Sequence, residues 1–176
     1  MDFTYIKFGI GIALIAILFG GLLGLSFGCC EHDIKNILKS NAQKVLIDQY
    51  GGDPDKAKKV YNKSWVYFKR AHLHSQTMGV IAIVIALLCA WLNFPSKFQI
   101  SISILSGVGS LGYGMFWLIS GYLAPVMGST GSAKESVAFL AQLSGASFFI
   151  ASASTFVLLA KKIFLEKNQQ GFEIKT

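Results

Sequence analysis

Histidine and cysteine are the residues of this chain best suited to chemistry, and they gather in two short stretches. The chain has three of each. Five of the six lie in these stretches: Cys29, Cys30, His32, His72 and His74. Imidazole and thiolate groups are ligands for zinc, copper and haem iron. We therefore predict candidate haem or metal ligands at His72, His74 and His32, and candidate metal ligands at Cys29 and Cys30.

The elements that must position these residues are membrane spans. Only 14% of the 176 residues are charged and 53% are hydrophobic, against roughly 25% charged residues in a soluble domain. These values exclude a disordered chain, a collagen and a disulfide-rich secreted scaffold, and they argue against a soluble enzyme. Four stretches free of Asp, Glu, Lys and Arg each exceed the roughly 20 residues that cross a bilayer as a helix. These stretches are 8–30, 71–96, 98–133 and 136–160.

The charge-free stretches define the fold class. We predict an all-α membrane protein, a four-transmembrane-helix bundle in which residues 1–176 form a single integral membrane domain. Pro95 and Pro125 follow the second and third spans, where proline ends a helix. The predicted spans cover about 8–28, 72–93, 99–122 and 133–160.

Four spans place both termini at one membrane face and the predicted ligands at the other. Residues two apart on a helix point about 200° apart, so His72 and His74 cannot face the same metal ion. A haem bound by one of them therefore needs a second axial ligand from another segment. His32 is the only other histidine, and Met115 or the weaker candidate Met127 would supply sulfur instead.

Two other interpretations of this site stay open. Histidines near a span end can hydrogen-bond to headgroups, water or loop carbonyls at little cost, and the cysteines can serve as small apolar residues. Alternatively, a quinone or proton-relay site would place hydrogen-bonding side chains around an apolar pocket. The candidates for that role are His74, Gln76, Tyr122 and Gln142.

The only long polar connection, residues 31–70, is predicted to be helical. Its first half has apolar residues at helical spacing: Ile34, Ile37, Leu38, Val45 and Leu46. This pattern predicts an amphipathic helix over 33–49. Such a helix lies on a membrane surface or binds a partner helix, and we favour the membrane surface.

A second helix is predicted to begin in the connection and to continue into the second span. Asp53 suits the N-cap, and Pro54 suits the first helical position, where its missing amide hydrogen is not needed. Trp65 and Tyr67 are predicted to mark the headgroup level, where amphipathic aromatic residues concentrate.

Small residues recur at four-residue intervals in every span. The sets are Gly20, Gly24 and Gly28; Ala82, Ala86 and Ala90; Ser106, Ser110 and Gly114; and Ser147, Ala151 and Thr155. Because helices in lipid associate through close backbone approach, we predict these faces to be packing faces.

The start of the fourth span has a capping-box pattern. Ser132 and Glu135 have the S-x-x-E spacing in which each side chain satisfies a backbone amide of the first turn. A helix N-terminus beside Lys134 is also a weak candidate site for a lipid phosphate or another anion. The preceding glycine-rich run lacks the spacing of a phosphate-binding P-loop.

Charge placement bears on orientation. Of the 16 Lys and Arg residues, six lie at the terminal face and ten at the loop face. However, the terminal face has more per residue, and Lys7, Lys161 and Lys162 directly adjoin their spans. We therefore expect a bacterial inner-membrane protein with both termini in the cytoplasm.

The missing motifs narrow the function. The chain has no C-x-x-C pair, and the acidic residues nearest the spans, Glu31 and Glu135, lie only at span ends. Both observations argue against a thiol oxidoreductase and a proton-coupled antiporter. We expect a non-catalytic integral membrane subunit or accessory protein of a larger assembly. Its expected partners are the bilayer and other membrane subunits or a second copy, not nucleic acid. The alternative is a membrane redox protein binding haem, copper or zinc at the histidine and cysteine face.

Overall fold

The computed structural model describes residues 3–166, with side chains as far as Phe164, and every regular element in this range is helical. Lys167 and Lys175, two of the terminal-face lysines counted above, lie outside it. Four helices are long and apolar enough to cross a membrane, as predicted. The elements are α1 (Lys7–Lys44), α2 (Leu46–Tyr50), α3 (Pro54–Trp91), α4 (Ser96–Leu123), α5 (Thr130–Ser136), α6 (Ala138–Ala160) and a π-helical extension, η1 (Lys161–Glu166).

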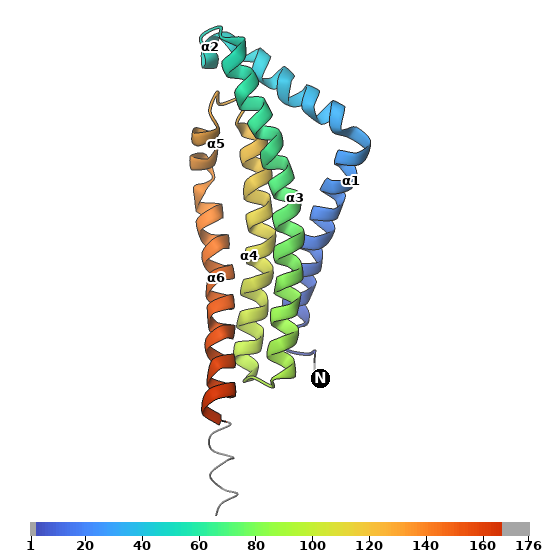
Figure 1. The fold of residues 1–176 in the computed structure, drawn as a ribbon, viewed down its shortest axis with the longest axis vertical. Coiled ribbons are helices and arrows are strands. Elements are labelled where there is room, and N and C mark those ends of the chain that lie inside the picture. Colours follow the sequence, from blue (N-terminus) through green and yellow to red (C-terminus); the bar gives the residue numbers. More distant parts are fainter. Residues whose placement is uncertain (1–2, 167–176) are drawn as a thin grey trace, which may run out of the picture.

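Helix α4 lies at the centre of the arrangement (Figure 1). It packs along α3, α1 and α6, and α1 also packs along α3. By contrast, α6 packs almost entirely on α4 and touches α3 very little. Helices α1 and α6 therefore flank α4 and α3 from different sides.

Small residues allow this close packing. A Cβ atom added at Gly20 would lie 2.9 Å from the backbone oxygen of His72, and one at Gly109 would lie 2.7 Å from that of Ser144. Most of the predicted small faces are buried between helices, which confirms that they are packing faces. Gly28 is the exception, because no atom of another helix among the described residues lies within 4 Å of a Cβ built there.

Most buried hydroxyl groups in the spans bond within their own helix. Ser106 donates to the Ser103 oxygen at 3.1 Å, and Ser110 donates to the Gly107 oxygen at 2.7 Å. Such bonds satisfy a polar group where no water is present. Ser75 and Ser120 differ, since their buried hydroxyl oxygens have no partner among the described residues.

The connection between the first two spans forms a helical hairpin, which we define as residues 31–70. Helix α1 leaves helical geometry at Cys30, with φ −135° and ψ 23°, and its second half runs obliquely back toward α2 (Figure 1). Helix α3 starts as predicted. The Asp53 carboxylate accepts hydrogen bonds from the amides of Asp55 and Lys56 at 2.9 and 3.1 Å, and Pro54 takes the first helical position.

The predicted amphipathic helix over 33–49 is wrong in its extent. Helix α1 ends at Lys44, and Val45 breaks the geometry before the short α2 begins. The stripe also divides between two environments. Leu38 is buried, and Ala42 packs in a core with Ala57 of α3, whereas Ile37 is 53% exposed. One arm of the hairpin therefore covers much of the other's apolar surface.

The loop between α4 and α5 holds the tip of the hairpin. The Tyr50 hydroxyl, at the end of α2, donates to the Pro125 oxygen at 2.8 Å. Gly128 has φ 68°, and a Cβ there would lie 2.8 Å from the Cβ of Gln49. Glycine thus provides both the left-handed turn and the space that the tip needs.

The predicted capping box is also wrong. Ser129 is the N-cap, and its hydroxyl oxygen accepts from the amides of Gly131 and Ser132 at 3.2 Å each. This cap begins the short α5, not the fourth span. Val137 then breaks the helix, and α6 begins at Ala138, about five residues later than predicted.

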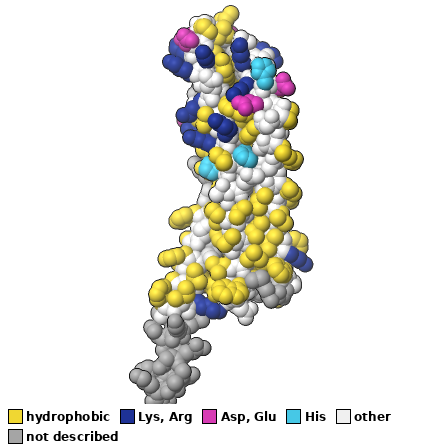
Figure 2. Space-filling view, turned by 45° about the vertical axis from the view of Figure 1, so that its right-hand side comes forward, with side chains coloured by type: hydrophobic (Ala, Val, Ile, Leu, Met, Phe, Trp, Pro, Cys, Tyr) yellow, Lys and Arg dark blue, Asp and Glu magenta, His cyan; other side chains and the backbone are white. Residues whose placement is uncertain are grey.

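Charge and hydropathy separate along the length of the molecule. Figure 2 shows Lys, Arg, Asp and Glu side chains gathered at the hairpin end, with mostly hydrophobic surface below. Histidine side chains lie both within the charged region and at its lower edge. The apolar section therefore matches the parts of the four helices that are suited to a membrane.

Candidate functional site

His72 faces α1. Its Nδ1 lies 2.7 Å from the Gly20 backbone oxygen, and because a carbonyl only accepts, Nδ1 carries the hydrogen. The ring also lies against Gly24 and meets Phe27 edge-on, with centroids 5.8 Å apart. In the neutral ring this tautomer leaves the lone pair on Nε2.

His74 faces α4 instead. Its ring meets Tyr113 edge-on at 5.1 Å and lies nearly parallel to Trp117, with centroids 6.1 Å apart and an interplanar angle of 17°. Helix α3 is regular through this region. The two imidazoles therefore contact different helices, as the expected rotation of about 200° predicts.

The other predicted ligands are dispersed. His32 and Cys29 are exposed, and Cys30 is half-buried at the bend in α1. Within residues 3–166, no three His, Cys, Asp or Glu side chains form a group suited to a metal ion. The half-buried Met127 lies in the loop after α4. The haem and metal sites therefore stay predictions.

An aromatic cluster that the sequence reasoning did not assign lies between α3 and α4. Its buried members are Tyr67, Phe116 and Trp117, with Tyr113 packed against them. Tyr67 is only 2% exposed, so it packs between helices, and its place at the headgroup level stays a prediction. Trp65, by comparison, is half-buried between the Phe27 ring, at 4.9 Å, and the Lys35 ammonium, at 5.1 Å.

Arg70 joins this cluster through its guanidinium group. The carbon at the centre of that group lies 4.7 Å from the Trp117 ring centroid and 5.7 Å from that of Tyr67. Spacing provided a signal for this contact, since Arg70 and His74 are four apart on α3, as are Tyr113 and Trp117 on α4. Residues four apart share a helix face.

The charge of Arg70 is not neutralised within the described part of the chain. The two ion pairs there join Lys35 to Glu31 and Lys56 to Asp53. The Nε1–H of Trp117 is buried and has no acceptor among the described residues either. Arg70 therefore contacts an indole whose own N–H also lacks a described acceptor.

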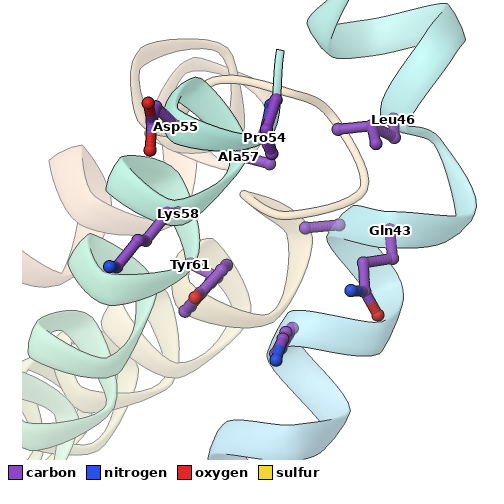
Figure 3. Close-up of a pocket in the computed structure, with 9 residues that line it drawn as sticks. Gln43, Leu46, Pro54, Asp55, Ala57, Lys58 and Tyr61 are labelled. Atoms are coloured by element: carbon purple, nitrogen blue, oxygen red, sulfur yellow. The ribbon is translucent and has the colours of Figure 1, made fainter. Parts of the chain in front are cut away.

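The hairpin contains a pocket of about 210 Å³ between its two arms (Figure 3). The α1 and α2 side contributes Lys39, Ala42, Gln43 and Leu46, and α3 contributes Pro54, Asp55, Ala57, Lys58 and Tyr61. In Figure 3, Leu46 points into the space between the arms, and Lys58 extends away from the α1 arm. The pocket is therefore mainly apolar, with charged groups around it.

Two titratable groups of the hairpin have shifted pKa values. The amides of Lys56 and Asp55 that bond to Asp53 lower the pKa of its carboxyl group. Burial raises the pKa of the Tyr50 hydroxyl, which keeps this group a hydrogen-bond donor. Both shifts favour the form that makes the hydrogen bonds described above, which is the ionised carboxylate of Asp53 and the protonated hydroxyl of Tyr50.

Lys134, the weak anion candidate, is half-buried on α5. It lines a shallow hollow with Phe116, Gly131, Glu135 and Ala138. The nearby carboxylate of Glu135 and the short length of α5 weaken this position as an anion site. The Lys134 site stays a prediction.

Comparisons with protein-family models, curated proteins and solved structures find no match for this chain. The functional argument therefore depends on the residues and geometry described above.

Proposed function

We propose that this chain is a non-catalytic integral membrane subunit or accessory protein. Its four long helices would form the transmembrane bundle, and the hairpin would be the part that a partner recognises. The observation that carries the proposal is the exposed apolar surface of the hairpin. Ile37 is 53% exposed and Ile47 is 80% exposed, although both lie outside the four predicted spans.

The surroundings of these isoleucines support a protein partner. The hairpin pocket has an apolar interior formed by Ala42, Leu46, Ala57 and Tyr61. Several hairpin lysines lie outside the two ion pairs of the described residues: Lys39, Lys44, Lys58, Lys59 and Lys63. Apolar anchors with basic residues around them favour a partner that offers apolar and acidic side chains.

The membrane section supports a role without catalysis. Its charge-free stretches provide no acidic residue, and most of its buried hydroxyls bond to their own helix. Glycine, alanine and serine occupy the helix contacts. These features serve helix packing, and they leave the hairpin as the part suited to recognition.

The proposed location is the bacterial inner membrane with both termini in the cytoplasm, so the hairpin would lie on the opposite, periplasmic side. Lys7, Lys161 and Lys162 support this orientation because they adjoin the terminal ends of their helices. Other membrane subunits or a second copy of the chain are the proposed partners.

Photo-crosslinking tests the proposal directly. A photoreactive amino acid at Ile47 is expected to form a discrete protein adduct in native membranes. The matched position is Ile150 on α6, which is 53% exposed in the apolar section and should crosslink mainly to lipid. Absence of a protein adduct from both Ile47 and Ile37 would contradict the proposal.

A second candidate function is a haem- or metal-binding redox protein, and His72 provides the observation that favours it. Metal-binding histidines usually donate their second ring N–H to a carbonyl or carboxylate, as His72 does to Gly20. Absorption spectra of the purified, oxidised and reduced protein test this candidate. His72→Ala or His74→Ala should remove a bound haem, whereas Cys89→Ala should not. Full cofactor content in both histidine variants would contradict it.

A further inference from the structure

The guanidinium group of Arg70 is a charged group to which neither the predicted metal site nor the proposed partner surface gives a role. It is the chain's only arginine, and it directly precedes the charge-free stretch 71–96. Its side chain is half-buried beside aromatic rings. A cation at this depth is less hydrated than one in open water, so a bound anion would be held more strongly.

Helix packing leaves the position accessible from one side. Helices α3 and α6 both pack along α4 but hardly touch each other. Arg70 and His74 lie on the α3 side, and Trp117 and Tyr113 lie on α4 between the two helices. The start of α6 reaches the same cluster through Leu140 and Ala141. The half-buried state of Arg70 and His74 shows that this packing does not cover them.

The indole of Trp117 positions the cation without neutralising it. The central carbon of the guanidinium lies 4.7 Å from the ring centroid, a cation–π contact that places no hydrogen-bond acceptor on its N–H groups. His74 lies nearly parallel to the same indole and supports the ring. None of the described carboxylates pairs with Arg70, and the buried Trp117 Nε1–H lacks a described acceptor as well.

We propose that Arg70, held by Trp117 and His74, binds the phosphate group of an anionic ligand at the border between the hairpin and the apolar section. Guanidinium groups bind phosphate oxygens in a bidentate manner. Both phospholipid headgroups and free phosphate offer this chemistry. The apolar side chains of α6 that begin here would also accommodate an acyl chain. This site does not depend on the proposed role of the hairpin.

Two binding measurements on the detergent-purified full chain test the site. The first determines anionic phospholipid bound per chain by mass spectrometry, after equilibration with phosphatidylglycerol in mixed micelles. The second determines inorganic phosphate bound to the delipidated chain by equilibrium dialysis. Arg70→Gln is expected to weaken binding at least tenfold, because it removes charge-assisted hydrogen bonds. Lys69→Gln is the matched control, since Lys69 is exposed and its loss changes net charge equally.

The results separate the two ligand sources. Arg70-dependent binding of phospholipid alone would identify a lipid site, and Arg70-dependent binding of inorganic phosphate would identify a site for a soluble anion. Equal binding by wild type and Arg70→Gln in both measurements would overturn the proposal. So would an equal loss in Lys69→Gln, because binding would then follow overall charge.

Two milder variants keep the test informative if Arg70→Gln does not fold. Arg70→Lys keeps the charge and loses the bidentate geometry, so binding should weaken several-fold. Trp117→Phe keeps an aromatic ring and loses the unpaired Nε1–H, and it should weaken binding by loosening the position of the guanidinium. Unchanged binding in both variants would overturn the proposed arrangement.

Discussion

The hydroxyl of Tyr50 makes a hydrogen bond that links the hairpin tip to the loop after α4. Tyr50→Phe leaves the buried Pro125 oxygen without this donor, which costs about 1–2 kcal/mol. We expect roughly tenfold faster amide hydrogen exchange in α2 and in residues 124–129. Tyr61→Phe is the control, because no hydrogen bond of its hydroxyl is found among the described contacts. Equal protection in wild type and Tyr50→Phe would show that the link does not hold the tip.

The carboxylate of Asp53 makes the start of α3 sensitive to pH. Its pKa is lowered in the folded protein by the amides that it accepts from. The stabilisation is therefore present above the ordinary carboxyl pKa of about 4 and is lost as pH falls through the lower folded value. We expect hydrogen exchange at the amides of Asp55 and Lys56 to accelerate on acidification beyond the ordinary pH dependence of exchange.

Asp53→Asn provides the comparison for this pH effect. Asparagine is also a good N-cap but does not titrate, so the variant should keep α3 protected with a flatter pH profile. An identical profile in wild type and Asp53→Asn would show that Asp53 is not responsible.

Close packing of α1 on α3 depends on Gly20. A Cβ at this position would lie 2.9 Å from the His72 backbone oxygen and 2.7 Å from the Cγ of Gln76. Gly20→Ala should therefore separate the helices and destabilise the protein by about 1–3 kcal/mol. Thermal unfolding in detergent, followed by tryptophan fluorescence, measures the change.

Gly28→Ala is the matched control on the same helix. No atom of another helix among the described residues lies within 4 Å of its added Cβ, and alanine favours a helix over glycine by up to about 1 kcal/mol. This variant should be as stable as wild type or slightly more stable. If both variants behaved alike, the contact at Gly20 would not be limiting.

At the scale of elements, the sequence predicted those helices and helix ends that a local pattern of residues determines. Long charge-free stretches predicted the four apolar helices, and Asp53 with Pro54 predicted the start of α3. The breaks at Cys30, Val45 and Val137 could not be predicted this way. None of these positions is a glycine or proline, so neither residue type signals the change in direction.

The contacts within the candidate sites depend on tertiary structure more strongly than the positions of the helices do. Helical geometry predicted that His72 and His74 face different neighbours. It could not show that His72 meets Gly20, or that His74 and Arg70 share the indole of Trp117. Residue type assigned Tyr67 to the headgroup level, and it could not show that packing between α3 and α4 buries this side chain.

At the scale of the whole molecule, the hairpin and the apolar section have different surfaces. Most charged side chains lie at the hairpin end, and mostly hydrophobic surface covers the section below (Figure 2). The proposed partner surface therefore lies apart from the surface that faces lipid. The proposed recognition through the hairpin and the proposed anchoring through the four helices can then be tested by separate mutations.

The mass of the complex extracted from native membranes in polymer-bounded lipid particles tests the central claim most directly. The proposal predicts that each particle holds the 19.1 kDa chain together with another membrane protein or a second copy. Ile47→Asn should reduce this association, whereas Asp48→Asn, an exposed neighbour on α2, should not. A stable particle containing one copy of the chain and no other protein would contradict the proposed role.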